Sequence, residues 1–180
     1  MSSLLYEINQ QINGVDLQNC YHCLKCASGC PMAGAMEYKP NEIIRMVQLG
    51  QRETLLNSSA IWLCVSCETC VTRCPNEIDT PRLIDILREM ALVEGITPAE
   101  PEVAGFHDAF LGTVKFGGRV NEPLMMVAYK AKTGTWLKDL VMGLKMFAKG
   151  KLKLLSPRTR NRTAIRRIFR RLAPRRGHSG

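Results

Sequence analysis

The sequence predicts an all-α protein in which one arrangement of loop and helix occurs twice. Apolar residues recur at the spacing of a helix face, and residues that start and stop helices bracket them. We find no convincing strand pattern anywhere in the chain. The first helix is expected over residues 3–13, where apolar side chains share one face and Gly14 follows as a stop.

Two cysteine motifs share one pattern. The first occupies residues 20–31 and the second residues 64–75, and both read C-x2-C-x2-C-x3-C-P. All eight cysteines of the chain lie in these motifs. Such a run holds iron–sulfur clusters in bacterial ferredoxins with two clusters, where the fourth cysteine ligates the other cluster. The spacing therefore predicts two [4Fe–4S] clusters.

The ligands of each cluster are expected to come from both motifs. Cysteines at i, i+3 and i+6 of a tight loop can reach three corners of one cubane, and the proline after the fourth cysteine turns the chain away. One cluster is therefore assigned to Cys20, Cys23, Cys26 and Cys74. The other cluster is assigned to Cys64, Cys67, Cys70 and Cys30.

Other uses of the cysteines fit the pattern less well. A disulfide framework is disfavoured because residues 1–10 carry no secretory signal. Structural zinc needs four ligands per ion and gives no reason for the third cysteine or for the proline. A thiol redox pair does not explain two complete runs. The histidines are not expected as ligands, because eight cysteines satisfy eight irons; they are His22, His107 and His178.

The segment between the motifs is expected to be helical. Pro40 starts a predicted helix that Leu49 and Gly50 end. Its apolar side is formed by Ile43, Ile44, Met46 and Val47. Residues 52–56 and 59–63 are expected to form further short helical turns.

The same order follows the second motif. Asp79 and Thr80 offer an N-cap, Pro81 suits the first helical position, and Gly95 ends the helix. The apolar face comprises Leu83, Ile84, Ile86, Leu87, Met90 and Ala91. These faces are expected to form the core and to keep water from the clusters.

Three segments are predicted along the chain. Residues 1–97 form the cluster domain, residues 98–155 a helical docking extension, and residues 156–180 a basic tail. In the extension, helical stripes are expected over 103–114 and 123–131. A later stripe at about one helical turn comprises Trp136, Leu140, Leu144 and Phe147.

Charge divides the chain into an acidic body and a basic end. Residues 1–144 carry 12 Lys and Arg against 16 Asp and Glu, whereas residues 145–180 carry 13 Lys and Arg and no acid. Residues 161–172 predict a basic amphipathic helix with an apolar face of Ile165, Ile168, Phe169 and Leu172. We expect this helix to dock on a neighbouring protein of a complex; an anionic membrane, nucleic acid or a solvated, disordered tail are the alternatives.

The cluster loops also differ in charge. Lys25, Arg73 and, when protonated, His22 lie beside the cysteines of the first cluster, whereas Glu68 lies in the loop of the second. Positive charge favours the reduced form of a cluster, so the first cluster is expected to have the higher potential.

The chain offers no predicted membrane span. No apolar run approaches the roughly 18–20 residues that cross a bilayer. Membrane contact is not expected, and reduced thiolates with oxygen-sensitive clusters favour a cytoplasmic location. No phosphate-binding glycine loop or Ser–His–Asp order is visible, so neither a nucleotide site nor a catalytic site is expected in this chain.

The motifs, the helical segment between them and the helix that begins at Thr80-Pro81 resemble the α-helical ferredoxin unit. A chain of this length with two [4Fe–4S] motifs and a basic extension resembles the C subunit of heterodisulfide reductase. The resemblance is specific over about residues 1–95 and loose beyond. It implies an electron relay between the flavin-containing A subunit and the disulfide-reducing B subunit, which holds non-cubane clusters.

The resemblance also implies where the disulfide chemistry lies. The non-cubane clusters of the B subunit need paired cysteines, and this sequence has no adjacent cysteines. The chain is therefore expected to be an electron-transfer subunit with no small-molecule substrate of its own. The alternatives are a relay in another oxidoreductase complex (sulfur-oxidising, quinone-linked or fumarate-reductase-like) and a nucleic-acid-binding iron–sulfur protein, which the confinement of basic residues to one end disfavours.

Overall fold

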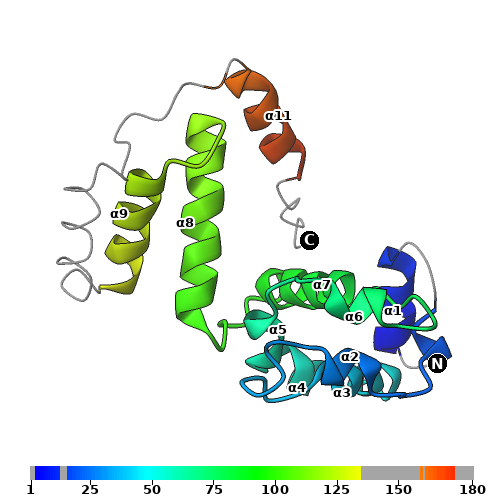
Figure 1. Cartoon of the computed structure of the whole chain (residues 1–180). Coiled ribbons are helices and arrows are strands. Elements are labelled where there is room, and N and C mark those ends of the chain that lie inside the picture. Colours follow the sequence, from blue (N-terminus) through cyan, green and yellow to red (C-terminus); the bar gives the residue numbers. More distant parts are fainter. Residues whose placement is uncertain (1–2, 13–15, 135–158, 160, 173–180) are drawn as a thin grey trace. The chain divides into compact units, whose positions relative to one another are not determined.

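The computed structural model describes residues 3–12, 16–134, 159 and 161–172. Within these residues every regular element is a helix and none is a strand, which confirms the all-α prediction (Figure 1). In chain order the elements are α1 (Ser3–Gln11), η1 (Leu17–Asn19), α2 (Lys25–Ser28), α3 (Pro40–Gln48), α4 (Arg52–Leu56), α5 (Ala60–Leu63), α6 (Thr69–Thr72), α7 (Thr80–Val93), α8 (Pro101–Gly117), α9 (Glu122–Thr133) and α11 (Arg162–Leu172). None of the helices so described is long and apolar enough to traverse a lipid bilayer.

The chain divides into two compact units, Met1–Pro101 and Glu102–Gly180. The predicted division at 97 and 155 stays a prediction. The apolar stripe predicted at Trp136, Leu140, Leu144 and Phe147 lies outside the described residues.

Helices α3 and α7 repeat one apolar pattern in the first unit. Residues 43, 44, 46 and 47 of α3 correspond to residues 83, 84, 86 and 87 of α7, and all eight side chains are buried. The start signals differ in detail. The Lys39 N–H donates to Glu42 Oε2 at 2.7 Å before α3, and the Arg82 N–H donates to Asp79 Oδ1 at 2.9 Å in α7. Each cap satisfies a backbone donor that the first helical turn leaves free.

The core of the first unit lies among α1, α3, α4, α5 and α7, which pack against one another. Its fully buried side chains are Ile8, Leu17, Ile43, Ile44, Leu55, Leu56, Ile61, Ile78, Leu83, Ile84, Ile86 and Leu87. Burying one such side chain stabilises the fold by about 1.5–3 kcal/mol relative to exposure. The short helices α2 and α6 pack on each other and belong to the two cysteine loops, so the core carries the loops side by side.

The second unit contains α8, α9 and α11. Phe106 of α8 meets Tyr129 of α9 edge to face, with ring centroids 6.1 Å apart. Arg162 and Arg166 of α11 donate to the carbonyl oxygen of Phe116 at 2.7 and 3.3 Å, in the last turn of α8. Both guanidinium carbons also lie 5.8 Å from the centroid of the Phe116 ring. The cationic groups therefore cap the carbonyl end of α8, which carries partial negative charge.

The amphipathic helix predicted over 161–172 is present as α11. Two of its arginines, Arg162 and Arg166, contact α8. Ile168 on the apolar side is 55 % exposed.

Candidate metal centres

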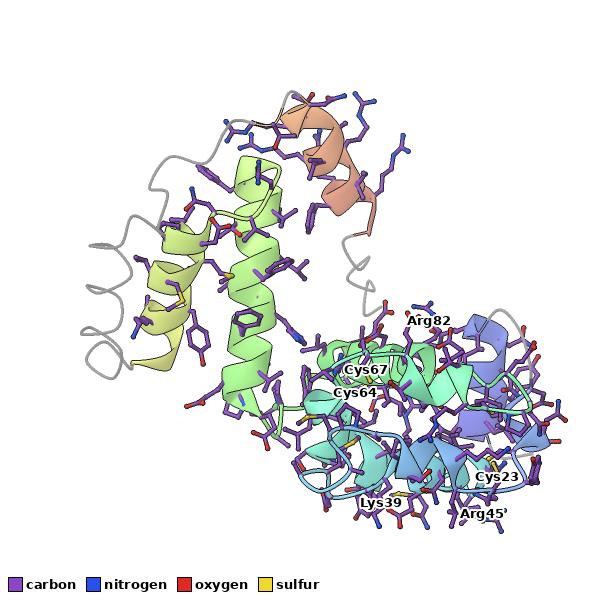
Figure 2. All side chains as sticks on the ribbon, viewed as in Figure 1. Cys23, Lys39, Arg45, Cys64, Cys67 and Arg82 are labelled. Carbon is purple, nitrogen blue, oxygen red and sulfur yellow. The ribbon has the colours of Figure 1, made fainter. Side chains whose placement is uncertain are left out.

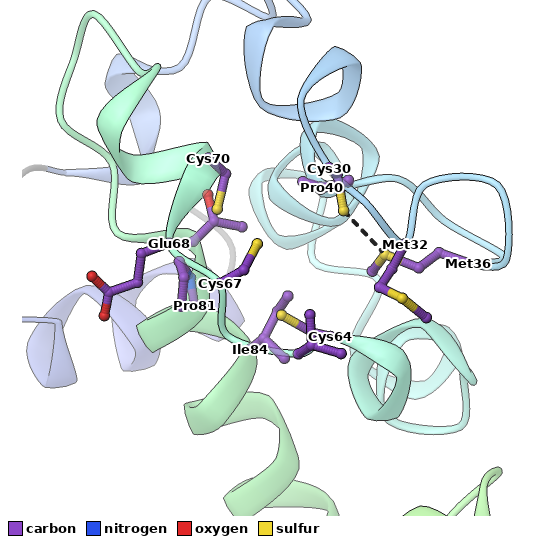
Figure 3. Close-up of a pocket in the computed structure, with 12 residues that line it drawn as sticks. Cys30, Met32, Met36, Pro40, Cys64, Cys67, Glu68, Cys70, Pro81 and Ile84 are labelled. Carbon is purple, nitrogen blue, oxygen red and sulfur yellow. Dashed lines mark hydrogen bonds between the residues drawn. The ribbon is translucent and has the colours of Figure 1, made fainter.

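The eight cysteines line two pockets of the first unit. The first pocket is lined by Cys20, Cys23, Cys26 and Cys74, together with Ile44, Ile78 and Asn41 among others. The second pocket is lined by Cys30, Cys64, Cys67 and Cys70, together with Met36, Pro81 and Ile84 among others (Figure 3). Each pocket thus takes three cysteines from one motif and the fourth from the other.

The two loops have the same backbone conformation. His22 and Leu24 have φ values of 57° and 66°, and Ser66 and Glu68, at the matching positions of the second loop, have 49° and 58°. Non-glycine residues rarely adopt this left-handed conformation, which costs about 1–2 kcal/mol per residue. Its occurrence at four matched positions, none of them glycine, marks it as a property of the motif.

This conformation brings backbone N–H groups to the sulfur atoms. Burial raises the pKa of Cys20 and of Cys64, and the N–H groups of His22 and Ser66 oppose the rise by hydrogen-bonding to the respective sulfur. N–H···S hydrogen bonds are among the features that set the potential of an iron–sulfur cluster.

Partial burial disfavours the thiolate form of Cys26 and Cys70 in the absence of a bound cation. Burial raises the pKa of Cys26, and it raises that of Cys70 to about 11 although the side chain of Thr80 hydrogen-bonds to it. The exposed Cys67 differs, because the hydroxyl and the N–H of Thr69 lower its pKa. Iron would favour the charged form at every position, so loading should release protons.

The donor sets fit [4Fe–4S] clusters. Each pocket offers four soft thiolate ligands within partly apolar walls, and a [4Fe–4S] cluster takes four cysteines. In the part of the chain that the structure describes, no three His, Cys, Asp or Glu side chains stand close enough to share one metal ion. A cubane does not require that closeness, because each thiolate binds a separate iron.

The two pockets share a wall at Thr80. This residue is 2 % exposed and lines both pockets. Cys23 and Cys67, in contrast, are exposed and lie well apart in Figure 2. The arrangement therefore combines a buried partition between two centres with a separate surface approach to each.

Several residues of the site lie outside the cysteine motifs and were not predicted. Met36 Sδ lies 4.0 Å from Cys30 Sγ, and Asn41 has a buried Oδ1 without a hydrogen-bond partner in the wall of the first pocket. Thr80 was expected only as part of an N-cap. Gln48 and Arg88 hold the chain before each motif through hydrogen bonds to backbone carbonyl groups. An alignment of α3 with α7 would have paired these last two residues; no sequence signal marks Asn41.

The fold and the pockets define a helical iron–sulfur protein with two [4Fe–4S] clusters, and residues 16–78 match the 4Fe-4S dicluster domain. The chain is 34 % identical over 79 residues to the C2 subunit of the H2/formate:CoB-CoM heterodisulfide,ferredoxin reductase of Methanococcus maripaludis, covering 44 % of this chain and 42 % of that protein. It is 36 % identical over 80 residues to the C subunit of the ferredoxin:CoB-CoM heterodisulfide reductase of Methanosarcina acetivorans, covering 44 % and 32 %. It is 29 % identical over 119 residues to the C 2 iron–sulfur subunit of the CoB–CoM heterodisulfide reductase of Methanocaldococcus jannaschii, covering 66 % and 60 %.

The chain spans about half the length of the curated relatives it matches. Within that span it is an iron–sulfur protein that resembles the C subunit of heterodisulfide reductase.

Proposed function

We propose that this protein relays electrons between two other subunits of a heterodisulfide reductase-type complex. The observation that carries the proposal is the pair of cysteine pockets that share Thr80 while Cys23 and Cys67 reach the surface separately. An electron can then enter through one exposed edge, cross the buried partition and leave through the other.

We further propose the ligand sets. Cys20, Cys23, Cys26 and Cys74 hold one cluster, and Cys30, Cys64, Cys67 and Cys70 hold the other. The lining of the two pockets supports this assignment, because in each pocket the fourth cysteine belongs to the other motif. Bound clusters supply one-electron chemistry, and the residues of the chain supply ligands, N–H donors and apolar cover.

The chain itself performs no bond-making step in this proposal. Its residues hold the clusters, keep water from their inner faces through Ile44, Ile78 and Ile84, and expose one edge of each to a partner. The partners are the flavin-containing A subunit and the disulfide-reducing B subunit with its non-cubane clusters. The resemblance and the names of the relatives support this choice, as does the absence of adjacent cysteines from the sequence.

Residues 98–155 and 156–180 serve as partner contacts in the same proposal. The net +13 of residues 145–180 suits an acidic surface, and attachment at two points raises the effective concentration of the contact. Assembly in the cytoplasm follows from reduced thiols and oxygen-sensitive clusters.

The test is anaerobic purification of the tagged full chain with its partners, followed by identification of the bound subunits. A flavoprotein and a protein with paired-cysteine motifs are expected in stoichiometric amounts. Subunits of a sulfur-oxidising, quinone-linked or fumarate-reducing enzyme would replace the proposal with that complex. Nucleic acid as the retained component would favour the nucleic-acid-binding alternative and overturn the relay.

A further inference from the structure

The two halves of the cluster unit hold the chain before each motif in the same way. Gln48 Nε2 donates to the carbonyl oxygen of Leu17 at 2.8 Å, and Leu17 lies three residues before Cys20. Arg88 Nε donates to the carbonyl oxygen of Ile61 at 2.6 Å, and Ile61 lies three residues before Cys64. Gln48 in α3 and Arg88 in α7 follow the matching buried residues Val47 and Leu87. They are counterparts in the repeat, but one side chain is neutral and the other is charged.

Arg88 reaches further into its site than Gln48 does. Its Nη2 donates to the carbonyl oxygen of the ligand Cys64 at 2.6 Å and to that of Trp62 at 3.3 Å. Its Nη1 pairs with Asp85 at 3.2 Å, on the solvent side of α7. The guanidinium therefore caps the carbonyl end of α5 and fixes the first cysteine of the second motif.

Gln48 is uncharged and contacts two other side chains at the other site. Its Oε1 lies 3.2 Å from Nε2 of His22 and accepts a hydrogen bond from Arg45 Nη1 at 3.2 Å. The nearest guanidinium on this route thus belongs to Arg45, an exposed residue that is separated from the cysteine loop by Gln48.

The positive charge of Arg88 acts more strongly than those near the first pocket because Arg88 is more buried. The side chain of Arg88 is 12 % exposed, whereas Lys25, Arg45 and Arg73 near the first pocket are exposed. Water screens exposed charges strongly and buried ones much less. The carboxylate of Asp85, which pairs with the guanidinium of Arg88, belongs to a side chain that is 51 % exposed, so water screens its charge more than that of Arg88.

Glu68, the acidic residue of the second loop, is among the residues that line the second pocket. The carboxylate of Glu68 points away from the four cysteines in Figure 3. Glu68 is exposed, so water and salt screen its charge.

We propose that Arg88 is a potential-setting residue, which raises the reduction potential of the cluster bound by Cys30, Cys64, Cys67 and Cys70. Reduction adds one negative charge to the cluster, and a fixed, weakly screened positive charge beside Cys64 stabilises that state. Arg88 also holds Cys64 in place, so it affects both the position of a ligand and the potential of the cluster. From Lys25, Arg73 and Glu68, the first cluster was expected to have the higher potential. Arg88 opposes that order because it raises the potential of the second cluster. The expectation did not include Arg88, which lies outside the cysteine motifs. The inference depends on the proposed ligand sets.

The test replaces Arg88 by its counterpart in the repeat, Arg88→Gln, in the full chain loaded with both clusters. Potentials are measured by EPR-monitored titration, and the two signals are assigned with Cys23→Ser and Cys67→Ser. The equilibrium constant for reduction of the second-pocket cluster should fall by about tenfold, which lowers its potential by about 59 mV for one electron. The first-pocket cluster should keep its potential and so serves as an internal control.

Two further variants separate charge from structure. Arg88→Lys keeps the charge but loses donors, so it should lower thermal stability with little change in potential. Arg52→Gln removes one positive charge from the same unit, at a site where Arg52 pairs with Glu7 and Glu94 away from both pockets, and should leave both potentials unchanged.

An unchanged second-pocket potential in Arg88→Gln, an equal shift of both clusters, or a shift in Arg88→Lys as large as in Arg88→Gln would overturn the inference. If Arg88→Gln does not retain both clusters, Arg88→Lys decides alone: a potential close to the wild-type value supports the charge effect, and a tenfold fall refutes it. Failure of the ligand sets is distinguishable, because it would appear in the cysteine variants as signals assigned to the wrong pocket.

Discussion

Cys30 and Cys64 line one pocket, although Cys30 closes the first cysteine motif and Cys64 opens the second. Cys74 stands in the corresponding position in the other pocket, with Cys20. The motifs are therefore interdependent in the folded chain. Loss of the fourth cysteine of one motif should therefore damage the cluster that the loop of the other motif holds.

Cys30→Ser should damage the cluster held by Cys64, Cys67 and Cys70, and Cys74→Ser the other. The wild-type protein should contain about eight iron and about eight sulfide per chain, from two four-iron clusters. Each variant should approach half of that content or show one altered EPR signal. Damage by each substitution to the cluster of its own loop would refute the crossed assignment, and zinc without sulfide would refute the clusters themselves.

The helices were accessible from sequence because their signals are local. Pro40 and Pro81 sit at helix starts, and Gly50 and Gly95 follow helix ends with φ of 75° and 72°. The apolar faces of α3 and α7 are buried as their spacing predicted. The crossed ligand sets were predicted from the motif and stay a prediction; the four cysteines assigned to each cluster line one pocket.

The rest of the site depends on contacts between distant segments. Arg88 meets Cys64 across 24 residues, and Thr80 lines both pockets because α7 begins between them. A single sequence shows that Arg88 lies on the polar side of a helix, but not which carbonyl groups it reaches. The contact of α11 with Phe116 was hidden for the same reason, because the sequence predicted a basic amphipathic helix that docks on a partner protein.

Leu87→Ala should test how far the shared core supports the first unit. Leu87 is fully buried at 0 % exposure on α7, and a cavity there should cost about 2–5 kcal/mol of unfolding free energy. Leu92→Ala, on the same helix but 59 % exposed, is the matched control and should change stability by at most about 0.5 kcal/mol. Urea unfolding of the loaded proteins measures both. Similar midpoints for the two variants would mean that α7 does not carry the core.

Gly29→Ala should disturb the packing of the two cysteine loops through Arg73. Gly29 has φ −100°, which alanine tolerates, but a Cβ would come 2.8 Å from Arg73 Cδ and closer still to its Nη1. Overpacking of this kind costs about 1–3 kcal/mol, and the low end is expected because the Arg73 side chain is exposed and can move.

A double-mutant cycle isolates that contact. Gly29→Ala should be nearly neutral when Arg73→Ala is already present, because the clashing side chain is gone. Thermal unfolding of the four proteins gives the coupling. An additive cycle would show that the cost of Gly29→Ala arises elsewhere.

Deletion of residues 156–180 should separate cluster binding from complex assembly. The segment carries nine arginines and no acidic residue, whereas all eight cysteines precede residue 75. The truncated chain should therefore retain its full iron and sulfide content but bind its partner subunits more weakly. Because the contact is electrostatic in part, the difference between truncated and full chains should change with ionic strength, with assembly of the full chain losing its advantage as salt rises.

The matched control keeps the charge of the tail except at its contact with α8. Arg162→Ala with Arg166→Ala removes the two guanidinium groups that meet Phe116, so it tests whether that contact alone accounts for the effect of the deletion. Assembly is measured by analytical ultracentrifugation of the anaerobic complex at low and high salt. The double variant should assemble better than the truncated chain, because the other seven arginines of residues 156–180 remain. Normal assembly of the truncated chain, with loss of binding to anionic liposomes or DNA instead, would assign the tail to a different partner.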